Sequence, residues 1–213
     1  MNTIDPIAVA VSFGVLLLSL TIHEAAHAWT ADKLGDPTAR VLGRVSLNPL
    51  VHIDWIGTVL LPLVAIFSRL PLIGWAKPVP VVLRNLRNPR RDFMIVAAAG
   101  PISNLLQAVV YALLFHAAAG AGDADADAPS MLRGILQLGV YINLLLAFFN
   151  LIPVPPLDGG NVMLGLLPPR LAVSFAQIRQ FGFIILYALM LTGVARAFIT
   201  PPTNFMMTIL GMP

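Results

Sequence analysis

Three residues near the N-terminus have the types and the spacing of a metal-dependent hydrolase. His23 and His27 are four positions apart in the segment His-Glu-Ala-Ala-His. On an α-helix they share one face, one turn apart, and can chelate a single ion. A catalytic zinc takes three protein ligands and a water, and it lowers the pKa of that water. Glu24 lies beside this face, so the pattern predicts a zinc centre with Glu24 as the general base.

The composition argues against a chance match. Glu24 is the only glutamate among ten acidic residues, and it lies between two of the four histidines. The alternative interpretation is a pair of interfacial histidines that end a membrane helix, since short motifs also occur by chance. Ionisable groups within an apolar helix are costly and by default indicate function. We therefore favour the metal centre.

The third ligand has to come from elsewhere in the chain. Cysteine is absent, which leaves histidine and carboxylate as ligands. Asp158 follows two prolines and precedes two glycines, which free the backbone from helical geometry and let the carboxylate turn inward. A solvated turn aspartate is the alternative. His52 with Asp54 is a second source of a ligand, and His116 is expected to be structural or interfacial.

The chain around these residues has the composition of a membrane protein. Of its 213 residues, 58% are hydrophobic and only 11% are charged, whereas about a quarter of residues are charged in soluble domains. The basic residues fall mainly in short connections between apolar runs, so we read them as topology signals and expect no nucleic-acid partner. We predict an all-α integral membrane protein in contact with the lipid bilayer.

Five apolar runs define the expected helix bundle. Four runs are about long enough to cross a bilayer, and they cover residues 7–29, 93–118, 132–152 and 171–199. The remaining run, residues 55–75, is second in the chain, is interrupted by proline and glycine and has basic loops on both sides. It either re-enters from the cytoplasm or crosses, and we favour re-entry.

Topology brings the candidate ligands together. With the N-terminus outside, the runs at residues 7–29 and 132–152 both end at the cytoplasmic side, where His27 and Asp158 lie. Short membrane-associated β-strands are expected at residues 44–47 and 78–83, which are β-branched or apolar pieces beside Pro and Asn. We expect residues 1–213 to form a single polytopic membrane domain.

These motifs resemble the site-2 protease family of intramembrane zinc metallopeptidases. Besides the His-Glu-x-x-His helix, the chain has Ala-Gly-Pro at 99–101 followed by Asn104. It also has Asn-Leu-Ile-Pro at 150–153, leading to Asp158. Together the matches are highly specific and extend over about three-quarters of the chain, from the first apolar run to Gly160.

The resemblance implies a function and a set of roles. The substrate would be a membrane-spanning segment of another protein, cleaved in or near the bilayer in regulated intramembrane proteolysis. The enzyme would be a multi-pass protein of the cell membrane with its active site near the cytoplasmic side. His23, His27 and Asp158 would bind Zn²⁺, and Glu24 would activate water. Candidates for positioning the substrate are Asn150, Asn104 and His52.

Two functions from other classes compete with this interpretation. A zinc transporter would also need intramembrane His and Asp, but it has no use for a glutamate between two ligands. An inactive scaffold that binds membrane helices would tolerate loss of the metal. The sequence also lacks a PDZ insert, a nucleotide-binding domain and any span before the His-Glu-x-x-His helix, which predicts a minimal member. Its substrate and oligomeric state are not specified by the sequence.

Overall fold

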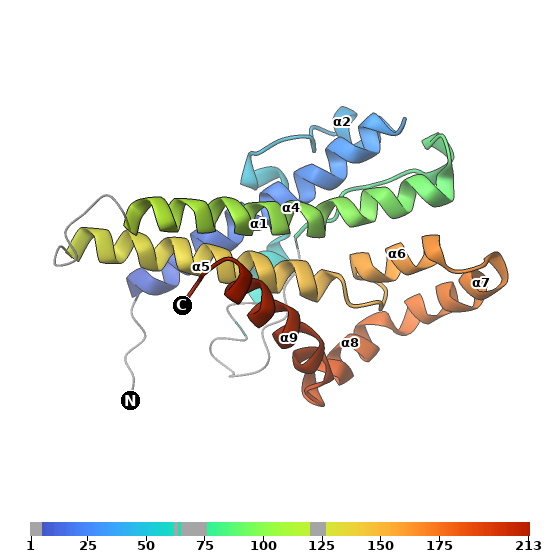
Figure 1. Cartoon of the computed structure of the whole chain (residues 1–213). Helices are drawn as coiled ribbons and strands as arrows, with labels where there is room; N and C mark the ends of the chain where they lie inside the picture. Colours follow the sequence, from blue (N-terminus) through green and yellow to red (C-terminus); the bar gives the residue numbers. More distant parts are fainter. Residues whose placement is uncertain (1–5, 62–63, 65–75, 120–126) are drawn as a thin grey trace.

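A computed structural model describes residues 6–61, 64, 76–119 and 127–213. Three long helices form the centre of the protein. These are α1 (Pro6–Lys33), α4 (Pro89–Ala119) and α5 (Asp127–Asn150), which lie side by side (Figure 1). Shorter helices follow and fold back along the bundle: α6 (Asp158–Leu166), α7 (Pro169–Gln177), α8 (Gly182–Leu191) and α9 (Val194–Ile209). The short α2 (Thr38–Val41) follows α1.

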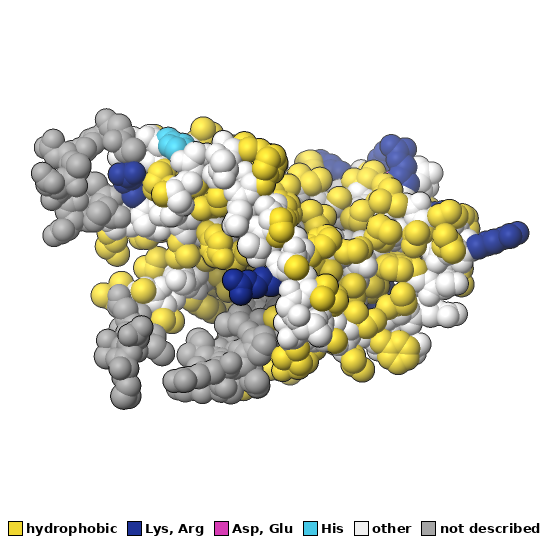
Figure 2. Space-filling view, turned by 60° about the horizontal axis from the view of Figure 1, so that its bottom comes forward, with side chains coloured by type: hydrophobic (Ala, Val, Ile, Leu, Met, Phe, Trp, Pro, Cys, Tyr) yellow, Lys and Arg dark blue, Asp and Glu magenta, His cyan; other side chains and the backbone are white. Residues whose placement is uncertain are grey.

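The length and apolar character of the helices fit a membrane. Four segments are long and apolar enough to cross one, and they are Ile7–Lys33, Pro89–Ala118, Met131–Asn150 and Pro169–Leu191. Hydrophobic side chains cover much of the face that Figure 2 shows. A helix satisfies its backbone hydrogen bonds internally, so such segments can face lipid. The all-α prediction for the membrane part is therefore correct.

The final apolar run is not one continuous helix. Gly193 has a φ of 78°, in the left-handed region that favours glycine, and it separates α8 from α9. The helix α9 then continues through Pro201 and Pro202, which we expected to lie beyond the end of the run. The predicted span at residues 171–199 is therefore too long at its C-terminal end, because the structure ends this apolar segment at Leu191.

The predicted β-strands are also wrong, because the described part of the chain contains helices and irregular segments only. At residues 44–47 and 78–83, backbone groups that would pair with a neighbouring strand are hydrogen-bonded to side chains instead. The Arg44 guanidinium donates to the carbonyl oxygens of Val51, Lys77 and Pro78. Pro78 and Pro80 have no N–H to give to a neighbouring strand.

A buried carboxylate ties the end of α1 to the segment before α4. Asp36 is fully buried and accepts hydrogen bonds from Thr38 Oγ1 at 2.5 Å, Val82 N at 2.6 Å and Asn85 Nδ2 at 2.8 Å. Burial alone would raise the pKa of Asp36, but these hydrogen bonds outweigh it and hold the pKa below its ordinary value. The ionised side chain thus fixes α1 relative to α4.

The interrupted run at residues 55–75 is described only at its start. There the π-helix η2 (Trp55–Leu60) begins after Asp54, whose carboxylate accepts from the N–H groups of Ile56 and Gly57. The remainder of this run, and with it the predicted re-entry, lies outside the described residues apart from residues 61 and 64.

Candidate metal centre

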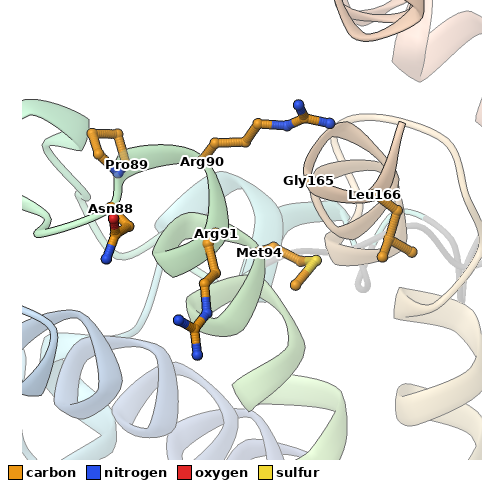
Figure 3. A pocket seen from close by; sticks show the side chains of 7 residues that line it. All are labelled: Asn88, Pro89, Arg90, Arg91, Met94, Gly165 and Leu166. Atoms are coloured by element: carbon orange, nitrogen blue, oxygen red, sulfur yellow. The ribbon is translucent and has the colours of Figure 1, made fainter. Parts of the chain in front are cut away.

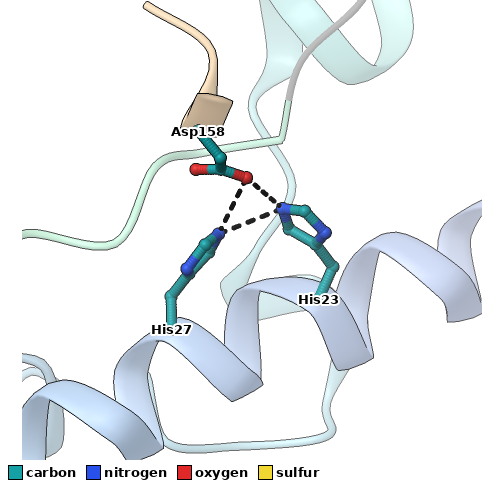
Figure 4. A group of neighbouring side chains, drawn as sticks. All are labelled: His23, His27 and Asp158. Atoms are coloured by element: carbon teal, nitrogen blue, oxygen red, sulfur yellow. Dashed lines mark hydrogen bonds and ion pairs between the residues drawn. The ribbon is translucent and has the colours of Figure 1, made fainter. Parts of the chain in front are cut away.

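The structure brings His23, His27 and Asp158 together, as Figure 4 shows. The two Nε2 atoms lie 3.0 Å apart, and Asp158 Oδ2 lies 3.1 Å from His23 Nε2 and 3.3 Å from His27 Nε2. Both histidines are buried, and Asp158 is half-buried. We call these three side chains the ligand group. Within the described ranges, they form the one group of three or more His, Asp or Glu residues close enough to share an ion.

Asp158 reaches the histidines because the chain turns sharply after α5. Asp158 is the first residue of α6, so the two glycines after it are helical and not irregular as we had expected. Their lack of side chains permits close packing instead. A Cβ on Gly159 would lie 2.3 Å from Leu151 O, and one on Gly160 would lie 2.4 Å from Pro155 N. The turn can therefore fold tightly under the helix that carries Asp158.

The donor atoms of this group fit a divalent metal. His27 Nδ1 lies 2.7 Å from the carbonyl oxygen of Val96, and His23 Nδ1 lies 2.6 Å from Asn104 Oδ1. An oxygen acceptor at Nδ1 requires the proton there, which leaves a lone pair on each Nε2. Asp158 Oδ2 is buried and has no hydrogen-bond partner. Three lone-pair donors thus converge, a set of nitrogen and oxygen ligands that suits zinc.

Glu24 lies on α1 directly after His23 and is half-buried. A carboxylate beside two metal ligands can accept a proton from a water at the ion. The arrangement can therefore support hydrolysis as well as metal binding.

Gly100 of α4 lies against both imidazoles. A Cβ at this position would lie 2.4 Å from His27 Nε2 and 2.5 Å from His23 Nε2. The space left by the missing side chain of Gly100 therefore lies at the Nε2 atoms of the two histidines. No side chain larger than hydrogen fits there without moving a histidine.

Gly100→Ala should therefore lower zinc affinity by at least about tenfold, an effect on the scale of disturbing the surroundings of metal ligands. The added methyl group would displace one or both Nε2 atoms. The measurement is competition with a chromogenic chelator on the purified protein. The matched control is Gly14→Ala on α1, where a Cβ would meet nothing within 4 Å. Equal affinities in the two variants would contradict this interpretation of Gly100.

The other sequence candidates lie in different surroundings. His52 is buried, and its Nε2 lies 2.8 Å from Ser46 O, while its own carbonyl accepts from Lys77 N. His52 therefore holds a loop and is not part of the ligand group. Asn150 ends α5, is half-buried and donates to Leu146 O at 2.9 Å. His116 is exposed and its Nε2 lies 2.8 Å from Leu210 O, so its role is structural.

Asn104 is fully buried and is hydrogen-bonded to His23 Nδ1. Asp158 lies at Nε2, on the opposite side of the same imidazole ring. Two further fully buried residues, Asn143 and Ser19, are connected to Asn104 and were not predicted from the sequence. The available signal was a polar residue in the middle of an apolar run.

An open cavity lies at the start of α4 and does not include the ligand group. Figure 3 shows Arg90 and Arg91 extending from the helix in different directions. The lining of this cavity contains no histidine or acidic residue. It comprises Asn88, Pro89, Arg90, Arg91, Met94, Gly165 and Leu166. This cavity cannot supply metal ligands.

Comparisons with known proteins agree with this chemistry. The model of peptidase family M50 matches residues 117–193, which include Asp158. A candidate zinc metalloprotease of Bacillus subtilis, YwhC, is 38% identical over 190 residues, covering 89% of this chain and 84% of that protein.

Two further relatives are candidate zinc metalloproteases called Rip2. The protein of Mycolicibacterium smegmatis is 32% identical over 83% of this chain and 64% of its own length. The protein of Mycobacterium tuberculosis is 31% identical over 89% of this chain and 71% of its own length. No solved structure matches the chain. The chain therefore belongs to peptidase family M50, the site-2 protease family, and is a membrane-associated zinc metallopeptidase.

Proposed function

We propose that this enzyme hydrolyses a peptide bond in or near a transmembrane segment of another membrane protein, as a step of regulated intramembrane proteolysis. The observation that carries the proposal is the location of the ligand group. His23 and His27 are buried in a helix that is apolar and long enough to cross a membrane, and they face α4 and α6 within the bundle. A site enclosed in this way meets membrane segments more readily than soluble peptides.

In this proposal His23, His27 and Asp158 hold zinc, whose chemistry there is to polarise a water and the scissile carbonyl. Glu24 takes the proton from that water as it attacks the carbonyl carbon. Glu24 then gives the proton to the amine that leaves when the C–N bond breaks. Asn150, half-buried at the end of α5 before the turn to Asp158, positions the substrate backbone.

We also propose a topology and a domain organisation. Residues 1–213 form a single multi-pass domain of the cell membrane with the site near the cytoplasmic side. Support comes from the basic residues Lys33, Arg40, Arg87, Arg90 and Arg91, which lie where α1 ends and α4 begins. Positive charge concentrates in cytoplasmic connections. His27 lies less than two turns before the end of α1 on this side.

A substrate helix must unwind before it can be cut, because its carbonyl groups are engaged in intrahelical hydrogen bonds. Small or helix-breaking residues near the scissile bond should therefore raise the rate of cleavage. No contact of Asn104 with substrate is needed in this mechanism, because its side chain is already bonded to His23 and Asn143.

The test uses purified zinc-loaded enzyme in liposomes with a single-span protein, and mass spectrometry of the products. We expect a cut within or next to the span, and a faster cut when a helix-breaking pair is placed beside it. Zinc chelation should stop the reaction. Products cut only in soluble segments far from the span would refute the intramembrane proposal.

A further inference from the structure

A line of hydrogen-bonded polar side chains runs behind His23 through the middle of the bundle. Asn104 Oδ1 lies 2.6 Å from His23 Nδ1, and Asn104 Nδ2 donates to Asn143 Oδ1 at 2.9 Å. Asn143 Nδ2 in turn donates to Ser19 Oγ at 2.9 Å. Ser19, Asn104 and Asn143 are each 0% exposed and come from α1, α4 and α5. We call these three side chains the relay.

The acceptors around Asn143, at the end of the relay away from His23, fix the orientation of its amide group. Asn143 Nδ2 also donates to the carbonyl oxygen of Gly139 at 2.9 Å, and a carbonyl can only accept. The Ser19 hydroxyl gives its single proton to Val15 O at 2.8 Å, so it too can only accept from Asn143. The amide of Asn143 therefore has one orientation, with its NH₂ group toward these acceptors and its oxygen toward Asn104.

The orientation of the Asn143 amide in turn fixes the orientation of the Asn104 amide beside His23. Because Asn143 presents an oxygen, Asn104 must turn its NH₂ group toward Asn143 and its oxygen toward His23. An amide oxygen can only accept, so the proton of the neutral His23 ring lies on Nδ1. The lone pair then lies on Nε2, the atom that faces His27 and Asp158.

We propose that Asn143 is a positioning residue for the metal centre. Acting through Asn104, it holds His23 in the tautomer that offers Nε2 to zinc, although Asn143 itself is bonded to neither the histidine nor Asp158. Without Asn143, the Asn104 amide can turn over and present its NH₂ group to His23, which favours the opposite tautomer. The proposal rests on the proposed role of His23 as a zinc ligand.

The test is a double-mutant cycle on the full chain purified in detergent, with zinc affinity measured by competition with a chromogenic chelator. Asn143→Leu alone should weaken binding by about 10- to 100-fold, the range for lost support of a ligand. In the Asn104→Asp background the same change should lower affinity by no more than about twofold, a non-additive result that shows coupling between the two residues. An ionised carboxylate accepts from His23 Nδ1 in either orientation and so needs no partner to aim it.

A purely structural role for Asn143 predicts the same loss in both backgrounds, and that result, like an unchanged affinity for Asn143→Leu, would overturn the proposal. Asn143→Ala is measured in parallel, so that a bulky replacement that fails to fold does not decide the outcome. The matched control is Thr21→Val, which removes a buried hydroxyl on α1 that donates to Leu17 O, on the helix itself. It should bind zinc as the unmodified chain does.

His23→Ala separates this proposal from the proposed function. If that variant keeps full zinc affinity, the metal centre itself is misplaced. If it loses zinc while the double-mutant cycle shows no coupling, the metal centre stands and only the relay is refuted.

Discussion

Glu24→Gln is expected to abolish peptide hydrolysis while leaving zinc bound. Glutamine keeps the size and hydrogen-bonding capacity of the side chain but cannot take a proton from water at neutral pH. General acid–base catalysis by one group is worth about 10² to 10⁴ in rate, so cleavage should fall by that factor. The three proposed ligands are not altered, and zinc content should stay at the level of the unmodified enzyme.

The measurement is the cleavage rate of a single-span protein in membranes, with zinc quantified on the same preparations. The pair of readouts separates the competing functions. A transporter would retain zinc flux after this substitution, and a scaffold would show no cleavage to lose. Unchanged cleavage by Glu24→Gln would exclude the mechanism in which this residue is the base.

Asp158→Ala should remove zinc from the purified protein. Asp158 Oδ2 lies 3.1 and 3.3 Å from the two Nε2 atoms, and alanine leaves only those two nitrogens in the group. Loss of supporting residues around a metal costs about 10- to 100-fold in affinity, and loss of a ligand should exceed the upper end of that range. Chelator competition and metal analysis after dialysis would both report the loss.

His52→Ala is the matched control for this experiment. His52 is a buried histidine outside the ligand group, and its ring bonds to Ser46 O. The variant should keep its zinc even if its loop becomes less stable. The opposite pattern, with zinc retained by Asp158→Ala and lost from His52→Ala, would identify His52 as the third ligand in place of Asp158.

The centre of the site could be predicted from the sequence because its geometry is local or depends on topology alone. His23 and His27 are one turn apart, so any helix brings them together. Asp158 follows the end of an apolar run, and the alternation of spans returns that end to the side where His27 lies. Their proximity in the structure agrees with that reasoning, whereas their roles stay predictions until metal and activity are measured.

Other features depend on contacts between distant residues that no local pattern contains. The segments predicted as strands are held by Arg44 and Asp36, whose partners come from separate parts of the chain. The α8–α9 turn depends on the positive φ of Gly193, which residue type alone permits but does not require. Asn143 was visible as a polar residue in an apolar run, but its link to His23 passes through a third helix.

The order of the three proposed ligands in the chain would also set the timing of activation during synthesis. His23 and His27 leave the ribosome early, whereas Asp158 emerges only after α4 and α5 have been made. Chains are synthesised from the N-terminus, so the ligand set is incomplete for most of translation and membrane insertion. A nascent chain arrested before α6 would hold two imidazoles without their carboxylate partner. With these ligands the enzyme would gain its metal, and with it its peptidase activity, only after its central helices have been made.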